Sequence, residues 1–217
     1  METTPRSQLR RLPQRGSHDW CDVARILDAG FMASVGFSVD GQPFVIPTLY
    51  GRSESTLYFH GSAASRMMKQ LSTGISACAT VTLTDSLVLA RSAFHHSINY
   101  RSVVAFGVAQ LVSDPAEKRQ ALEVISEHLI PGRWSEVRAP SDKELKATAV
   151  IRFTIEEASA KVRTGPAADD EEDYVMPVWA GVLPLALQPG EAVPDARICV
   201  NPEPPQYIRN YATRLAR

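Results

Sequence analysis

Residues 31–50 carry the pattern that most constrains the fold of this chain. Residues 31–39 follow a period of two, strand-forming residues return over 44–50, and Asp40-Gly41 separates the two runs. Such alternation predicts strands, and Asp-Gly between them is typical of a tight hairpin turn. The pattern therefore indicates an antiparallel hairpin and not a βαβ unit. Pro47 lacks an N–H group, so we expect it at a sheet edge, at a bulge or where the sheet opens.

The remaining patterns extend an antiparallel arrangement. Strand-forming residues recur over the ranges 57–59, 75–83 with an extension to 89, 100–112, 148–155 and 158–162. A short helix is predicted from His18 to near Gly30, and a longer one begins after Asp114 as N-cap, with Pro115 in its first turn. About six antiparallel strands with peripheral helices predict a mainly β fold, and closure into a small barrel would remove exposed strand edges.

Residues 57–69 form a second informative stretch. Strand formers at 57–59 lead into Gly61, which permits a sharp turn, and Ser62 is expected to cap a helix that runs to Leu71. Arg66 and Lys69 lie three residues apart, so both project from one side of that helix. A helix start beside two cations is suited to a phosphate group. An ordinary strand-to-helix connection with two solvated cations fits the same residues, and both interpretations stay open at this point.

Composition excludes several classes of protein. The chain has 217 residues, 44% of them hydrophobic, and a net charge of −1. This balance argues against a general nucleic-acid binder, because binding to the phosphate backbone requires a clustered positive face. No apolar run reaches the about 20 residues that cross a bilayer, so we expect neither a nucleic-acid nor a membrane partner, and a cytoplasmic location. Cys21, Cys78 and Cys199 are expected to be reduced, mostly structural thiols.

The chain divides into three parts. Residues 1–17 are polar, rich in arginine and interrupted by two prolines, so we expect a flexible basic arm. Residues 18–164 hold the predicted barrel. Residues 165–217 begin with five consecutive acids at 169–173, which predict a solvated loop, and continue into an apolar run at 178–185. That run is too apolar to be left in water, so it is expected to pack on the barrel or on a partner subunit.

Four motifs, taken in their order and spacing, resemble a known family. They are Phe59-His60-Gly61-Ser62 with Arg66, residues 99–104 leading to Gly107, the turn at residues 163–166, and residues 179–184, which begin with Trp179. Together they resemble the pyridoxamine 5'-phosphate oxidase-like, FMN-binding split-barrel superfamily, in particular its flavin-nucleotide-binding branch that includes the nitroimidazole-resistance proteins. The resemblance covers roughly residues 18–187.

The resemblance implies a split β-barrel homodimer with two FMN sites between the subunits. Arg66 falls at the family's phosphate-binding arginine. Lys69 is a second cation, although the family more often has a basic residue directly after the arginine, where this chain has Met67. The resemblance implies further site residues in four groups. Phe59, His60 and Ser62 fall beside the phosphate and ribityl chain, Val45, Ile46, Pro47 and Thr48 run along the flavin ring, Arg101 and Ser102 reach the ring or phosphate, and Trp179 comes from the partner subunit. Tyr100 is either a neighbour of the cofactor or substrate or an ordinary aromatic strand residue, and both interpretations stay open.

A flavin would explain why the sequence shows no acid/base pair and no nucleophile triad, because the cofactor carries the redox chemistry itself. The pyridoxamine phosphate oxidases proper have a C-terminal Arg-x-His pattern, and residues 211–217 contain no histidine. We therefore expect an FMN-dependent oxidoreductase of another small, aromatic or nitro-bearing molecule, with a reduced nicotinamide as electron donor. The alternatives are a non-catalytic protein that binds flavin, haem or a deazaflavin, and a cofactor-free structural dimer.

His95 and His96 are adjacent in a segment predicted to turn before the strand at 100–112. Adjacent residues on a strand point to opposite faces, so the pair is poorly placed to chelate one metal ion. A proton-donating role for one of them toward substrate stays a hypothesis.

Overall fold

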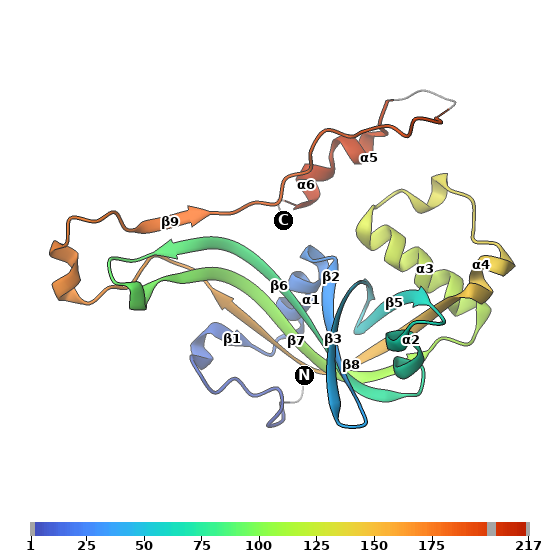
Figure 1. Ribbon diagram of the computed structural model, residues 1–217, viewed down its shortest axis with the longest axis horizontal. Helices are drawn as coiled ribbons and strands as arrows, with labels where there is room; N and C mark the ends of the chain where they lie inside the picture. Colours follow the sequence, from blue (N-terminus) through green and yellow to red (C-terminus); the bar gives the residue numbers. More distant parts are fainter. Residues whose placement is uncertain (1–2, 199–202, 216–217) are drawn as a thin grey trace.

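The computed structural model describes residues 3–198 and 203–215. Its centre is one antiparallel sheet in the order β3-β2-β6-β7-β8-β5-β4, with β1 added beside β8 and β9 beside β6. The strands are β1 (Gly16–Ser17), β2 (Met32–Val39), β3 (Gln42–Leu49), β4 (Gly51–Ser53), β5 (Thr56–Ser62), β6 (Ile75–Leu89), β7 (Ser97–Leu111), β8 (Thr148–Arg163) and β9 (Gly181–Pro184). Figure 1 shows the sheet curling into an open, split barrel, which confirms the predicted mainly β fold.

The structure has nine strands where about six were predicted, because three short strands have no visible sequence pattern. β1, β4 and β9 have two to four residues each, which is too short for a period-two pattern to be visible. The two strands expected at 148–155 and 158–162 are one strand, β8, whose register with β7 shifts between Phe106 and Gly107. A bulge of this kind interrupts the alternation without ending the strand.

Short helices flank the sheet. They are α1 (Trp20–Ala29), α2 (Arg66–Leu71), α3 (Pro115–Leu129), α4 (Asp142–Ala147), α5 (Gln206–Arg209) and α6 (Tyr211–Leu215), with 3-10 turns at Pro13–Arg15, Ala93–His95, Trp134–Glu136 and Glu171–Val175. Asp114 caps α3 by accepting from the Glu117 N–H at 2.9 Å, as predicted. No helix in the part of the chain that the structure describes is long and apolar enough to cross a membrane.

The core lies on the concave side of the sheet. Phe59 of β5 and Phe153 of β8 are fully buried with ring centroids 6.1 Å apart, and α1 adds Val23, Ile26 and Leu27 to the same cluster. Each fully buried side chain of this size contributes about 1.5–3 kcal/mol relative to exposure. Because Phe59 points into this core, the next residue on β5 must face the other side of the sheet.

The described part of the expected flexible arm, residues 3–17, lies against β8. Gly16 and Ser17 pair with Lys161 and Ala160. Glu157 is only 6% exposed, and its carboxylate accepts hydrogen bonds from the Thr4 hydroxyl at 2.6 Å, the Ser7 hydroxyl at 2.7 Å and the Arg6 guanidinium at 2.7 Å. A buried carboxylate needs such partners, which is a physical reason for this docking.

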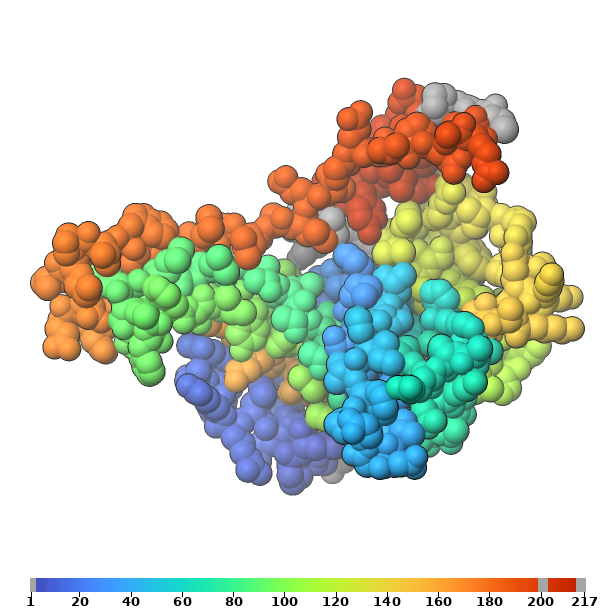
Figure 2. Space-filling view, viewed as in Figure 1, coloured from blue at the N-terminus to red at the C-terminus, as the bar shows by residue number. Residues whose placement is uncertain are grey.

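The segment after Gly165 runs back along the long β6–β7 hairpin and then reaches α3 (Figures 1 and 2). β9 pairs with β6, with Leu183 opposite Leu87, so this segment packs on its own chain. The acidic loop is also anchored, since Asp169 accepts from the N–H groups of Arg91 and Ser92 at 2.9 and 3.2 Å. Cys21 and Cys78 are free thiols, and Cys199 lies outside the described residues.

Candidate functional site

The predicted phosphate cradle is the turn between β5 and α2. β5 continues through Ser62, which pairs with Thr148, so α2 begins at Arg66. The expectation that Ser62 caps this helix is therefore wrong: the N-cap is Ser65, whose hydroxyl accepts from the Met68 N–H at 3.2 Å. The Ser62 carbonyl instead accepts from the Ser65 N–H at 2.9 Å and closes the turn.

Arg66 and Lys69 are both exposed on α2. Among the described residues neither forms an ion pair, and Arg66 instead lies over the ring of Phe44 on β3, 4.9 Å from its centroid. A cation held over an aromatic face keeps its N–H donors available. Arg66 can therefore accept an anionic group beside β3, and Lys69, three residues on, adds a second exposed cation on the same helix.

β3 supplies the neighbouring wall and is an edge strand, because it pairs only with β2 in the described sheet. The predicted edge position of Pro47 is thus confirmed. Val45 is 69% exposed and Pro47 is exposed, whereas Ile46 and Thr48 are half-buried. One backbone edge and one apolar face of this strand are free within the described chain, and a flat ring could lie against them.

Other predicted site residues lie on the hairpin side of the sheet and not at the cradle (Figure 1). Tyr100, Arg101 and Ser102 are on β7, where Arg101 pairs with Asp85 at 2.8 Å beside a cavity of about 470 Å³. Trp179 precedes β9 and is 71% exposed. Within one chain these residues do not meet Arg66.

His95 and His96 lie in and beside the 3-10 turn that precedes β7, as expected. His95 Nε2 lies 3.3 Å from Asp170, and His96 Nδ1 accepts from the Ala90 N–H at 3.0 Å. They therefore make separate contacts. Over residues 3–198 and 203–215, no three histidine, cysteine or carboxylate side chains gather as a metal site.

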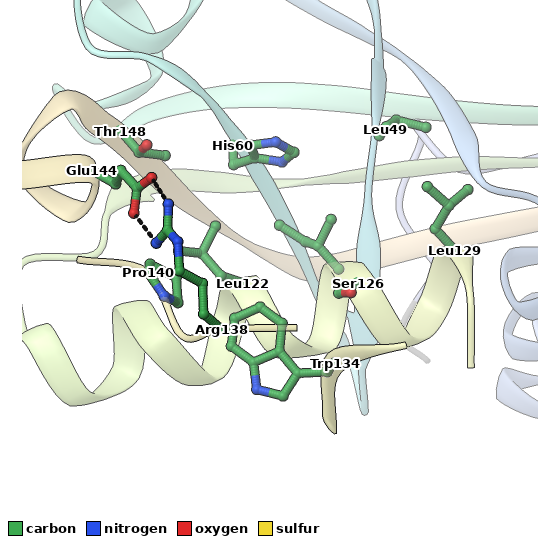
Figure 3. Close-up of a pocket in the computed structure, with 11 residues that line it drawn as sticks. Leu49, His60, Leu122, Ser126, Leu129, Trp134, Arg138, Pro140, Glu144 and Thr148 are labelled. Carbon is green, nitrogen blue, oxygen red and sulfur yellow. Dashed lines mark hydrogen bonds and ion pairs between the residues drawn. The ribbon is translucent and has the colours of Figure 1, made fainter. Parts of the chain in front are cut away.

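His60 occupies a different environment from the cradle. It projects from the outer face of β5 into a cavity of about 530 Å³ under α3 (Figure 3). The lining residues are Leu49, His60, Leu122, Ile125, Ser126, Leu129, Trp134, Arg138, Pro140, Glu144 and Thr148. The ring forms no hydrogen bond with any described residue, and its Nδ1 is buried. Burial lowers the pKa of His60, so the imidazole is neutral at pH 7.

An ion pair closes one side of this cavity. Arg138 donates to both carboxylate oxygens of Glu144, at 2.8 and 2.5 Å (Figure 3). Glu144 also accepts from the Ser141 N–H at 2.8 Å and so completes the capping box of α4. Hydrogen bonds from Arg138 and Ser141 hold the pKa of Glu144 well below its usual range.

Sequence reasoning did not find Trp134, Arg138 or the α3 residues of this cavity. They belong to a connection with no periodic pattern, and only the tertiary approach of α3 to the sheet brings them to His60. The alternation along β5 was the available signal, because Phe59 in the core requires His60 to point the opposite way.

Comparisons with known proteins place the chain among flavin-associated folds. A family model described as pyridoxamine 5'-phosphate oxidase matches residues 19–162. The flavocytochrome Anf3 from Azotobacter vinelandii is 43% identical, with a TM-score of 0.88 over 95% of this chain and 96% of that one. An FAD and heme binding protein from Mycobacterium smegmatis is 33% identical, with a TM-score of 0.85 over 90% and 96%.

A more distant structure shares the fold alone. It is a candidate 5-nitroimidazole antibiotic resistance protein from Bacteroides thetaiotaomicron, 22% identical, with a TM-score of 0.57 over 68% of this chain and 86% of that one. No curated protein sequence matches the chain.

Proposed function

The chain belongs to the pyridoxamine 5'-phosphate oxidase family, and we propose that within it the chain is a flavin-dependent oxidoreductase that also holds a haem. The observation that carries the flavin part is Arg66, held against β3 by Phe44, with Lys69 exposed on the same helix and neither cation in an ion pair among the described residues. The names of the Azotobacter and Mycobacterium relatives support both cofactors.

The flavin phosphate would bind at Arg66 and Lys69, because a phosphate dianion is best held by charge-assisted hydrogen bonds. Phe44 orients the Arg66 guanidinium, and the unpaired backbone edge of β3 would run along the ring. When bound, the flavin supplies hydride and single-electron transfer, while the protein binds, orients and shields it.

The identity of the flavin is the finer part of the proposal. FMN was expected from the sequence, whereas the Mycobacterium relative is named for FAD. FMN and FAD share the phosphate next to the ribityl chain, so the same cradle suits either one. We favour FAD, and chromatography of the nucleotide released from purified protein distinguishes the two.

The proposal includes a homodimer in the cytoplasm. Trp179 is 71% exposed, and Leu183, Leu185 and Leu187 extend the same apolar surface along the β9 segment. A second copy would cover this surface and bring its Tyr100, Arg101, Ser102 and Trp179 toward the flavin. Trp179→Ser should shift the chain toward monomer in sedimentation experiments, and an unchanged dimer would count against this interface.

The test of the flavin site compares Arg66→Ala with Arg25→Ala, a control in which an exposed arginine on α1 is removed. Loss of a charge-assisted hydrogen bond of about 1.5–3 kcal/mol predicts roughly 10- to 150-fold weaker flavin binding for Arg66→Ala. The control should bind as the wild type does. Equal affinities for both variants, or a wild type that binds no flavin, would overturn the cradle assignment.

Turnover is tested separately. A reduced nicotinamide should bleach the bound flavin, and a nitroaromatic compound should speed its reoxidation. A flavin that no nicotinamide reduces would favour the alternative of a non-catalytic binding protein.

A further inference from the structure

Among the residues that the structure describes, His60 is the histidine without a hydrogen-bond partner. Each of the other four histidines contacts a backbone group or a carboxylate. His18 contacts the Ala158 carbonyl at 3.0 Å, and His128 contacts the Gly30 carbonyl at 2.7 Å. His95 contacts the Asp170 carboxylate, and His96 accepts from the Ala90 N–H. A histidine that serves only packing or architecture is normally bonded in this way, because an unpaired buried polar atom costs free energy. The described chain therefore leaves this imidazole able to bond a group from outside it.

The walls of the cavity are suited to a large, flat, mostly apolar ligand. Leu122 and Leu129 of α3 form one side, and Trp134 lies beside them (Figure 3). Ile125 of α3 also lines the cavity. A volume of about 530 Å³ is within the range of roughly 300–1,000 Å³ seen for cofactor pockets. Arg66 and Lys69 do not line this cavity, so a flavin phosphate at the cradle leaves it available.

Arg138 can change partners with little loss. It is 73% exposed in its pair with Glu144, and exposed ion pairs contribute little to stability. If Arg138 turns toward a ligand carboxylate, Glu144 keeps its hydrogen bonds to the N–H and hydroxyl of Ser141. Neither charge is then left buried without a partner.

We propose that this cavity takes an iron porphyrin, with His60 as an axial ligand of the iron and Arg138 as the partner of a porphyrin carboxylate. This assignment rests on the haem binding proposed above and adds the residues that perform it. A neutral imidazole, apolar walls and one exposed cation are the three features that such a ligand requires. On binding, the imidazole of His60 would add to the iron, and Arg138 would exchange Glu144 for the porphyrin carboxylate. Neither change requires a supplied electron or proton.

The test titrates the full-length chain, freed of haem, with hemin and follows the Soret band. His60→Ala should change the band shape and weaken hemin binding at least about tenfold, a loss of the size seen when metal-site partners are removed. Added imidazole should restore the wild-type spectrum. Iron-free protoporphyrin should bind His60→Ala and the wild type equally, because only the iron contact is lost. His95→Ala is the control and should match the wild type.

Arg138→Ala should weaken hemin and iron-free protoporphyrin alike, by about tenfold for one charge-assisted bond. The matched control is Arg25→Ala, which removes another exposed arginine pair, with Asp22, that does not line the cavity. Far-UV circular dichroism checks that each variant is folded, and His60→Gln replaces His60→Ala if the latter is not.

Unchanged hemin binding and an unchanged spectrum in His60→Ala would overturn the axial assignment. If wild-type protein binds hemin but both His60 variants lose flavin and keep haem, the cavity belongs to the flavin and the assignment is wrong. If the wild type does not bind hemin, the assignment and the haem part of the function both fail. The flavin part is judged independently from the Arg66 variants.

Discussion

Gly51 sets the distance between α3 and the sheet, and Gly51→Ala tests how far the His60 cavity depends on that distance. A Cβ at position 51 would lie 2.6 Å from both Cα and N of Ile125 and 2.7 Å from the carbonyl carbon of Val124. These are backbone atoms, so no side-chain rotation relieves the contact. Because carbon atoms pack at about 3.5–4.0 Å, α3 must retreat by about 1 Å.

The expected effect follows from two opposing contributions. Overpacking costs about 1–3 kcal/mol, and alanine in place of glycine offsets about 0.4–1 kcal/mol by restricting the unfolded chain. Gly51 does not have a positive φ, so backbone strain adds nothing. A net loss of about 1–2 kcal/mol predicts a Tm lower by roughly 2–8 °C in a chain of this size.

Thermal unfolding of the cofactor-free chain, followed by circular dichroism, measures this shift. Gly190→Ala is the matched control, since its added Cβ meets no atom within 4 Å and should leave Tm nearly unchanged. Hemin affinity should fall in Gly51→Ala and not in the control, because Ile125 lines the cavity. Equal Tm values for the two variants would refute the idea that the glycine permits the close approach of α3.

Three further changes probe other parts of the molecule. Tyr50→Phe removes a buried hydrogen bond to the Leu27 carbonyl at 2.5 Å. The free energy of unfolding, measured with urea, should fall by about 1–3 kcal/mol because the carbonyl loses this donor. An unfolding free energy equal to that of the wild type would contradict this. His60→Leu should raise the Tm of the haem-free chain, because an unpaired buried nitrogen is replaced by an apolar group; a lower Tm would indicate a structural role. Hydrogen bonds from Thr4, Ser7 and Arg6 lower the pKa of Glu157 from 4.5 to about 2, so its contribution to stability is complete above pH 4.5 and is lost as the pH falls toward 2. In Glu157→Gln, the free energy of unfolding measured with urea at a series of pH values should lack this pH-dependent contribution. Plots of unfolding free energy against pH that stay parallel for the wild type and the variant would argue against it.

The sequence predicted the parts of the fold that local rules specify. The hairpin of β2 and β3, the edge position of Pro47 and the Asp114 cap follow from alternation, a missing N–H group and side-chain capping, all of which act within a few residues. The cap of α2 was misplaced because Ser62 and Ser65 are chemically equal candidates, and only the pairing of Ser62 with Thr148 decides between them.

The cavity could not be predicted in the same way. His60, Trp134 and Arg138 become neighbours only when α3 approaches β4 at Gly51 and when β5 pairs with β8. A glycine that permits a close approach and a glycine in an ordinary turn look alike in one sequence. The network around Glu157 was missed for the same reason, because its partners lie at the opposite end of the chain.

The pairing of β5 with β8 also has a consequence for the order of folding. β6, β7 and β8 follow one another as neighbours in the sheet, and β6 and β7 meet through a short turn, whereas residues 56–62 must find residues 148–154 across the whole intervening sequence. Long-range pairing carries a larger loop-closure cost and is slow. His60 lies on β5, so its cavity is assembled by one of the most non-local steps of folding. If the cavity holds haem as proposed, haem uptake during refolding should lag behind the recovery of β structure and report when a newly made chain has finished folding.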